Sequence, residues 1–143
     1  MDKYFNANAI FSIFSKKYME LKKDLPIRPS EMGVLNIITK KDGLFTPLMI
    51  AELLEVSKPM ITNHITVLEN KGYIIREYSK EDKRSFYLIP TEKAKELVEV
   101  TEKKMSKYLQ QIENSVGKEN FNQLLQMLTE ANKTLKNIEG EDL

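Results

Sequence analysis

The middle of the chain carries the pattern that most limits its fold. Two short apolar helices are predicted about three residues apart, and β-forming sequence follows them directly. Thr46 and Ser57 each precede a first helical turn that contains proline, where a hydroxyl can cap open backbone amides. Apolar residues then recur at helical spacing up to Gly72, which suits a left-handed helix end. This arrangement is typical of a helix-turn-helix.

The sequence period changes after Gly72. Residues 73–78 and 86–89 are rich in β-formers, and the stretch 79–85 between them is polar throughout. We therefore expect a hairpin with a long charged tip. A hairpin of this kind beside the second helix of a helix-turn-helix has the geometry of a wing.

Further helices are predicted on both sides of this central part. Apolar spacings of three and four indicate helices at 7–25 and at about 30–40. After Thr91 a long helix is expected, and Gly117 separates it from a last one. Gly140–Leu143 should form a frayed tail. The expected fold class is mainly α with a small β-hairpin wing, a winged helix-turn-helix flanked by N- and C-terminal helices.

Composition excludes several kinds of chemistry. The chain has no cysteine, which excludes disulfides, thiolate zinc sites, cysteine nucleophiles and thiol-based redox sensing. Its single histidine, His64, excludes a histidine-rich metal site within one chain. No phosphate-cradling glycine loop or Ser/His/Asp arrangement is present, so we expect no catalytic residues, no metal and no cofactor. An enzyme is the weakest interpretation.

The second central helix has a polar outer face. On a helical wheel Ile61, Ile65 and Leu68 point one way, whereas Asn63 and Thr66 point the other. Asparagine can pair bidentately with adenine, threonine can bond several base edges, and an open helix amino end can face a phosphate. Such a face is also common on ordinary surface helices. On the DNA interpretation, the contacts from this helix are Ser57, Lys58, Met60, Thr62, Asn63 and Thr66.

Charge gives weaker support. The net charge is +1, but residues 57–84 carry 6 basic and 4 acidic side chains, whereas residues 85–143 carry 8 and 10. The centre is therefore +2 and the C-terminal part −2, a distribution that agrees with a nucleic-acid footprint at the centre.

Specific motifs make the chain similar to a known family. Asp82-Lys83-Arg84-Ser85 followed by Thr91-Glu92-Lys93 resembles the wing signature of the MarR family, in which Asp-x-Arg precedes a strand and a Leu-Thr helix start. The recognition-helix pattern and the arginine that opens the wing are matched by Thr62, Leu68, Glu69, Lys71-Gly72 and Arg76. The resemblance covers essentially the whole chain.

The resemblance implies a role for each matching residue. Arg84 would enter a narrow A·T-rich minor groove from the wing tip, with Lys83 beside it. Asp82 would hold Arg84 in position, and Thr62 and its neighbours would face the major groove. The chain departs from the family pattern at four positions. Asn63 and Val67 stand where arginine is frequent, Pro90 replaces leucine and Ala94 replaces glycine, which affects affinity and base preference.

The helices at the two ends indicate a dimer. Their apolar stripes exceed what a small winged domain can cover, and an isologous dimer buries one patch twice. An intramolecular bundle is the alternative. We expect a 1–29 dimerisation helix, a 30–90 winged helix-turn-helix DNA-binding domain and 91–143 dimerisation helices, intertwined as a single domain.

The function expected is that of a sequence-specific transcriptional regulator. It would be a repressor that binds a pseudo-palindromic site on double-stranded DNA as a homodimer. The alternative is a winged-helix module for protein interaction without sequence-specific DNA binding. No apolar run approaches the ~20 residues of a membrane span and no secretory signal is apparent, so a cytoplasmic, prokaryotic protein, associated with the nucleoid when bound and without a membrane partner, is expected.

A small amphipathic or phenolic effector is a further expected partner, because the resemblance implies release of DNA by such ligands. Such a ligand changes the affinity of the protein for DNA only if it binds one of two states of the protein more tightly than the other. Plain core packing is the alternative role for the candidate lining residues, which are Phe11, Phe14, Tyr18, Met32 and Tyr108.

Overall fold

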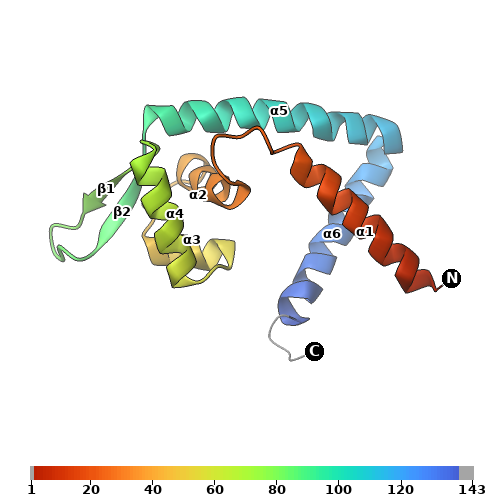
Figure 1. The fold of residues 1–143 in the computed structure, drawn as a ribbon, viewed down its shortest axis with the longest axis horizontal. Coiled ribbons are helices and arrows are strands. Elements are labelled where there is room, and N and C mark those ends of the chain that lie inside the picture. Colours follow the sequence, from red (N-terminus) through yellow and green to blue (C-terminus); the bar gives the residue numbers. More distant parts are fainter. Residues whose placement is uncertain (1, 139–143) are drawn as a thin grey trace. The chain divides into compact units, whose positions relative to one another are not determined.

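A computed structural model describes residues 2–138, which form six helices and one two-stranded sheet. The elements in chain order are α1 (Lys3–Glu20), α2 (Pro29–Lys40), α3 (Pro47–Leu54), α4 (Lys58–Asn70), β1 (Ile74–Tyr78), β2 (Phe86–Pro90), α5 (Glu92–Val116) and α6 (Lys118–Ile138) (Figure 1). The expected fold class, helices with a hairpin wing, is confirmed. The frayed tail predicted at Gly140–Leu143 lies outside the described residues.

Backbone contacts divide the chain into two units, with the boundary between Thr101 and Glu102 inside α5. The first unit holds α1 to β2 and the start of α5, and the second holds the rest of α5 and α6. The predicted segments 1–29, 30–90 and 91–143 are functional assignments, and they stay predictions. Within residues 2–138, no helix combines the length and the apolar character that a membrane span requires.

The first helix is displaced from its predicted position at 7–25. It begins earlier because the Asp2 carboxylate accepts a hydrogen bond from the Tyr4 N–H at 3.2 Å and caps the helix. It ends at Glu20 because the following turns change to bonds that span three residues, such as Lys22 N–H to Met19 O at 3.0 Å. The connector to α2 is therefore longer than the prolines alone indicate.

The hydrophobic core of the first unit is formed by α2, α3, α4, the hairpin and the start of α5. Leu35, Ile50, Ile61 and Leu68 are among its fully buried side chains. The hairpin is tied to this core, because the Leu88 N–H donates to the Phe45 carbonyl at 2.9 Å. The other core elements thus hold α4 in place, and α1, which has no buried residue, does not contribute to that core.

The turn between α3 and α4 depends on one unusual residue. Glu55 adopts a left-handed conformation, with φ 58°, where glycine is the favoured residue. The next residue closes the turn, since the Val56 N–H reaches the Ala51 carbonyl at 3.0 Å. Thr46 and Ser57 cap α3 and α4 as predicted, each accepting from an amide three residues later at 3.3 Å.

The other end of α4 is joined to both the hairpin and α5. Gly72 has φ +81°, and the Tyr73 N–H bonds back to the Leu68 carbonyl at 2.9 Å, which closes the helix. The Thr91 hydroxyl donates to the Gly72 carbonyl at 2.8 Å, and it accepts from the Ala94 N–H at 3.3 Å at the start of α5. Thr91 thus ties three elements together at one point.

The second unit consists of the end of α5 and α6. Gly117, with φ +95°, ends α5 as predicted, and its N–H donates to the Glu113 carbonyl at 2.8 Å. α6 contains no buried residue, and Leu125, Met127 and Leu135 on it are exposed.

Candidate nucleic-acid interface

α4 has two different faces. Ile61, His64, Ile65 and Leu68 are buried against the core. Thr62, Asn63 and Thr66 are exposed. The polar side that the sequence assigned to DNA therefore faces outward.

The hydroxyls on this outer face are held by the helix itself. The Thr62 hydroxyl donates to the Lys58 carbonyl at 2.9 Å, and the Thr66 hydroxyl donates to the Thr62 carbonyl at 3.0 Å. Each oxygen keeps the capacity to accept a hydrogen bond. Because these bonds fix the two side chains before any ligand arrives, the outer face is a preorganised surface.

The amino end of α4 carries the remaining predicted contacts from this helix. The Ser57 hydroxyl accepts from the Met60 N–H at 3.3 Å, so one of the open amides is capped. Lys58 is exposed, and so is Met60. A helix amino end with a lysine in its first turn is a favourable position for a phosphate.

The wing is a regular hairpin with a structured tip. β1 and β2 pair antiparallel, with Ile74 opposite Pro90 and Tyr78 opposite Phe86. At the tip the Asp82 carboxylate accepts from the Arg84 N–H at 3.0 Å and from the Arg84 Nε–H at 3.4 Å. The Arg84 side chain is nevertheless 93% exposed, and Lys83 is exposed beside it. The tip thus presents an exposed guanidinium whose orientation is set by the two hydrogen bonds to Asp82.

An ion pair that the sequence analysis did not anticipate joins the wing to α4. The Arg76 Nε–H donates to the Glu69 carboxylate at 2.9 Å, and the Arg76 guanidinium lies 4.5 Å from the centre of the Phe86 ring. The sequence predicts only that Glu69 and Arg76 match the family pattern. Their pairing depends on the packing of β1 beside α4 (Figure 1). The contact fixes the wing relative to the outer face of α4.

The wing tip and the amino end of α4 border a common depression. An open pocket of about 380 Å³ is lined by Lys58 and Thr62 from α4 and by Arg84 and Ser85 from the wing. Predicted DNA contacts from two separate elements are therefore brought to one place.

His64 is buried, with 4% of its surface exposed. Among residues 2–138, neither ring nitrogen has a hydrogen-bond partner. The histidine therefore belongs to the core side of α4 and does not face a phosphate.

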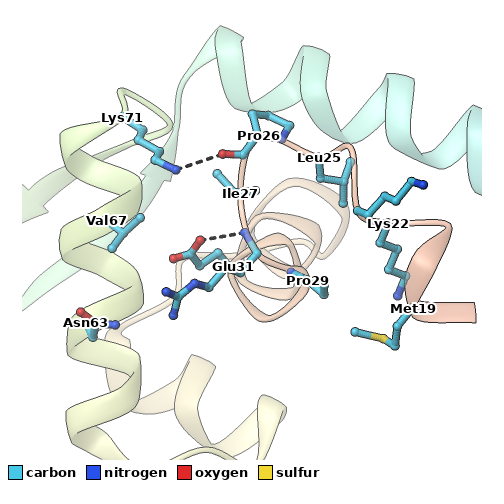
Figure 2. Close-up of a pocket in the computed structure, with 12 residues that line it drawn as sticks. Met19, Lys22, Leu25, Pro26, Ile27, Pro29, Glu31, Asn63, Val67 and Lys71 are labelled. Atoms are coloured by element: carbon cyan, nitrogen blue, oxygen red, sulfur yellow. Dashed lines mark hydrogen bonds between the residues drawn. The ribbon is translucent and has the colours of Figure 1, made fainter. Parts of the chain in front are cut away.

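A second open pocket of about 600 Å³ lies between the α1–α2 connector and α4 (Figure 2). Two hydrogen bonds order its walls. The Lys71 ammonium donates to the Pro26 carbonyl at 3.0 Å, and the Arg28 N–H donates to the Glu31 carboxylate at 2.9 Å. Asn63 also lines this pocket. The sequence analysis assigned no function to the basic residues of this connector. Their only sequence signal is the pair Lys22-Lys23 shortly before Pro26.

The residues predicted to line an effector site belong to three helices, and their role stays a prediction. Phe14 and Tyr18 stack with ring centres 6.0 Å apart, and Phe11 is exposed on the same helix. Met32 is buried in the core, and Tyr108 belongs to the second unit. None of the five lines the pocket beside α4.

Comparisons with known proteins agree with this geometry. Residues 27–86 match the model of the MarR family. Several solved structures share the fold over most of the chain. Their sequence identities to this chain are low, so the likeness shows a common fold and no more. FabT from Streptococcus pneumoniae, solved in complex with DNA, is 23% identical, with 96% of this chain and 99% of that chain covered and a TM-score of 0.76. MepR from S. aureus in its DNA-binding conformation is 20% identical, with 90% and 98% covered and a TM-score of 0.73.

A MarR protein from Peptoclostridium difficile is 21% identical, with 92% of this chain and 88% of that chain covered and a TM-score of 0.77. A search of curated protein sequences finds no match. The matched segment contains α2, α3, α4 and most of the wing, which together define a winged helix-turn-helix protein. Residues 27–86 thus carry the winged-helix segment of the MarR family of transcriptional regulators, which confirms the resemblance seen in the sequence. The matched model is that of a family of transcriptional regulators, which are not enzymes.

Proposed function

We propose that the protein is a repressor that binds a pseudo-palindromic site on double-stranded DNA as a homodimer. One observation carries this proposal. The polar face of α4 is exposed, and a wing with an exposed, oriented arginine lies beside it. Two solved structures of the same fold contain DNA, which supports DNA as the partner: FabT, and the transcriptional repressor CouR bound to a 23-mer duplex.

In the proposed complex α4 lies in the major groove. Asn63 would pair with an adenine edge, and Thr62 and Thr66 would contact neighbouring bases. Ser57 and Lys58 would face the phosphate backbone at the amino end of the helix. Met60, 47% exposed, would pack against a thymine methyl group. The absence of arginine at positions 63 and 67 makes direct base contacts depend on short polar side chains.

The wing is proposed to enter the adjacent minor groove. Arg84 would occupy the groove, where a narrow A·T-rich segment concentrates negative potential. Asp82 would orient Arg84 through the two hydrogen bonds at the tip, and Lys83 would contact a phosphate. Glu69 and Arg76 would transmit the position of α4 to the wing, so that both grooves are read together.

A dimer is proposed because one chain leaves the apolar stripe of α1 exposed. Ile10, Phe11 and Phe14 all expose about half or more of their surface. A two-fold dimer buries such a patch twice, and it places two recognition helices about 34 Å apart on one face of the duplex. We assign residues 1–29 and 91–143 to dimerisation and 30–90 to DNA binding. A repressor of this kind acts in the cytoplasm of a prokaryotic cell.

The test is a titration of labelled duplexes at two salt concentrations. An A·T-rich palindrome and a generic duplex of equal length are compared by fluorescence anisotropy with the full chain. A DNA reader loses affinity steeply with salt, because each neutralised phosphate releases a counterion. A protein-interaction module without DNA specificity would bind both duplexes equally weakly, and that outcome would refute the proposal.

Variants at the wing tip sharpen this test. Arg84→Ala should weaken binding to the A·T-rich palindrome by about 1–3 kcal/mol, the range of a good groove contact. Lys80→Ala is the matched control, since Lys80 is an exposed cation on the same loop and is expected to cost less. Equal losses for the two variants would mean that Arg84 acts only as a surface charge.

A further inference from the structure

The open pocket beside α4 carries an excess of positive charge. Its charged lining consists of four cations and one carboxylate, namely Lys22, Lys23, Arg28, Lys71 and Glu31. We propose that this pocket binds the sugar–phosphate backbone of DNA on the side of α4 that faces away from the wing. It is a second backbone contact, separate from the one at the wing, and it rests on the proposed function.

The two sides of α4 face different neighbours. Successive residues of a helix turn by about 100°, so Asn63, Val67 and Lys71 form a row along one side. This row lines the pocket and faces the connector (Figure 2). Glu69 lies roughly 160° around the helix from Val67, and its carboxylate pairs with Arg76 of the wing. The polar outer face of α4 therefore lies between the wing on one side and the pocket on the other.

A helix in the major groove has a DNA backbone on each side of it. The groove is about 12 Å wide and a helix with its side chains measures about 10–12 Å, so both sides of the helix approach phosphates. α4 brings little charge of its own, because its only lysine or arginine is Lys58 and its only carboxylate is that of Glu69. Lys58 and the wing serve one backbone. The cations of the pocket are in place for the other.

The pocket keeps its positive charge available to a ligand. Glu31 is 2% exposed, and its carboxylate accepts from the Arg28 N–H at 2.9 Å, so the acidic group is committed to the protein. Lys71 uses one of its three donors on the Pro26 carbonyl at 3.0 Å, which holds the ammonium at the pocket wall. Lys23 and Arg28 are exposed, and within residues 2–138 neither side chain takes part in an ion pair.

The apolar part of the lining fits the same ligand. Met19, Leu25 and Val67 line the pocket together with the cations. A DNA strand presents the C–H groups of a deoxyribose next to each phosphate, so one strand meets both kinds of side chain. Contacts of this kind position the protein on the duplex and carry no sequence information.

Salt titrations of the full chain test this contact by fluorescence anisotropy. Lys23→Gln with Arg28→Gln removes two charges and keeps the backbone N–H of residue 28 that Glu31 binds. Affinity for the A·T-rich palindrome and for the generic duplex should fall by the same factor, about tenfold or more at the lower salt concentration. The slope of log affinity against log salt should become shallower by about 1 to 2.

Lys16→Gln with Lys17→Gln is the matched control. This pair removes the same charge from exposed positions on α1 that do not line the pocket, so it should cost less affinity. Equal losses in the two double variants would mean that DNA responds to net charge alone, and the proposal would be overturned. A loss confined to the A·T-rich palindrome would overturn it as well, because Lys23 and Arg28 would then read bases.

Val67→Arg tests the same position from α4. Added to the Lys23→Gln and Arg28→Gln chain, it places a guanidinium on the side of α4 that lines the pocket. It should restore most of the lost affinity for both duplexes and steepen the salt slope again. An arginine that restored nothing would show that no backbone lies on this side of α4.

The outcomes separate this inference from the proposed function. If the unchanged chain binds neither duplex, both fail. If the unchanged chain binds the palindrome, and Lys23→Gln with Arg28→Gln alters neither the affinity nor the salt slope, the backbone contact is rejected and the proposed function stands.

Discussion

α1 carries ten apolar residues and α4 carries five, and the two helices use them differently. α4 buries Ile61, Ile65 and Leu68 in a core that α2, α3, the hairpin and the start of α5 complete within one chain. α1 is longer, yet none of its residues is buried, and Phe11 is 69% exposed. The difference shows that the winged part completes its core within one chain, whereas α1 needs an additional surface to gain stability from its apolar stripe.

This contrast separates two sources of stability. Burial within one chain contributes to folding at any protein concentration. Burial between chains contributes only when the partner is present, so its effect varies with concentration. Substitutions on the two helices should therefore differ in kind as well as in size.

The largest effect is expected from the inner face of α4. Leu68→Ala removes a fully buried side chain and should lower the free energy of unfolding by about 2–5 kcal/mol. Urea denaturation followed by circular dichroism measures this loss, which should be the same at every protein concentration. Thr66→Ala, on the exposed face of the same helix, is the control and should stay within about 0.5 kcal/mol. A loss that depended on concentration would contradict the self-sufficiency of the winged part.

The corresponding change on α1 is Phe11→Ser. If α1 packs on a second copy, the substitution removes about 1.5–3 kcal/mol of burial per protomer. The melting temperature of the wild type should rise with protein concentration, and that of the variant should be lower at low concentration. Leu44→Ser, an exposed leucine in the winged part, is the control. A monomer by light scattering, with no concentration dependence in either protein, would favour the intramolecular bundle.

The sequence predicted the winged part well because its determinants are local. Thr46, Ser57 and Gly72 define helix ends through caps and backbone conformation, and the structure uses all three as expected. The predicted bounds of the first helix were wrong. The helix ends at Glu20 in a series of turns, and no single residue type in the sequence marks that end.

Tertiary contacts account for what sequence reasoning missed at the site. The pairing of Glu69 with Arg76 depends on how β1 packs beside α4. The pocket beside α4 requires the connector to meet residues more than forty positions later, as the Lys71 to Pro26 bond shows. Local periodicity contains no information on such contacts.

A smaller effect should follow from the buried histidine of α4. The two ring nitrogens of His64 lack partners among residues 2–138, and an unsatisfied buried polar group costs about 1–3 kcal/mol. His64→Met fills a similar volume without that cost and should raise the free energy of unfolding by about 1 kcal/mol. Urea denaturation measures the gain, and DNA affinity should not change because the side chain faces the core. A loss of stability would show that the imidazole is hydrogen-bonded in solution.

The smallest effect concerns the turn that orients α4. Glu55 holds a left-handed conformation that costs an L-residue about 1–2 kcal/mol. Glycine adopts this conformation without strain, but its more flexible unfolded chain lowers the free energy of unfolding by about 0.4–1 kcal/mol. Glu55→Gly should therefore be more stable than Glu55→Ala by roughly 0.5–1 kcal/mol. Comparing these two variants removes the contribution of the carboxylate, since both lack it. Gly72→Ala tests the same physics in reverse: a Cβ there meets no atom within 4 Å, so any loss of stability reports backbone strain alone. If alanine matched glycine at position 55, the turn would relax without strain, and the orientation of α4 would depend on core packing instead of on this residue.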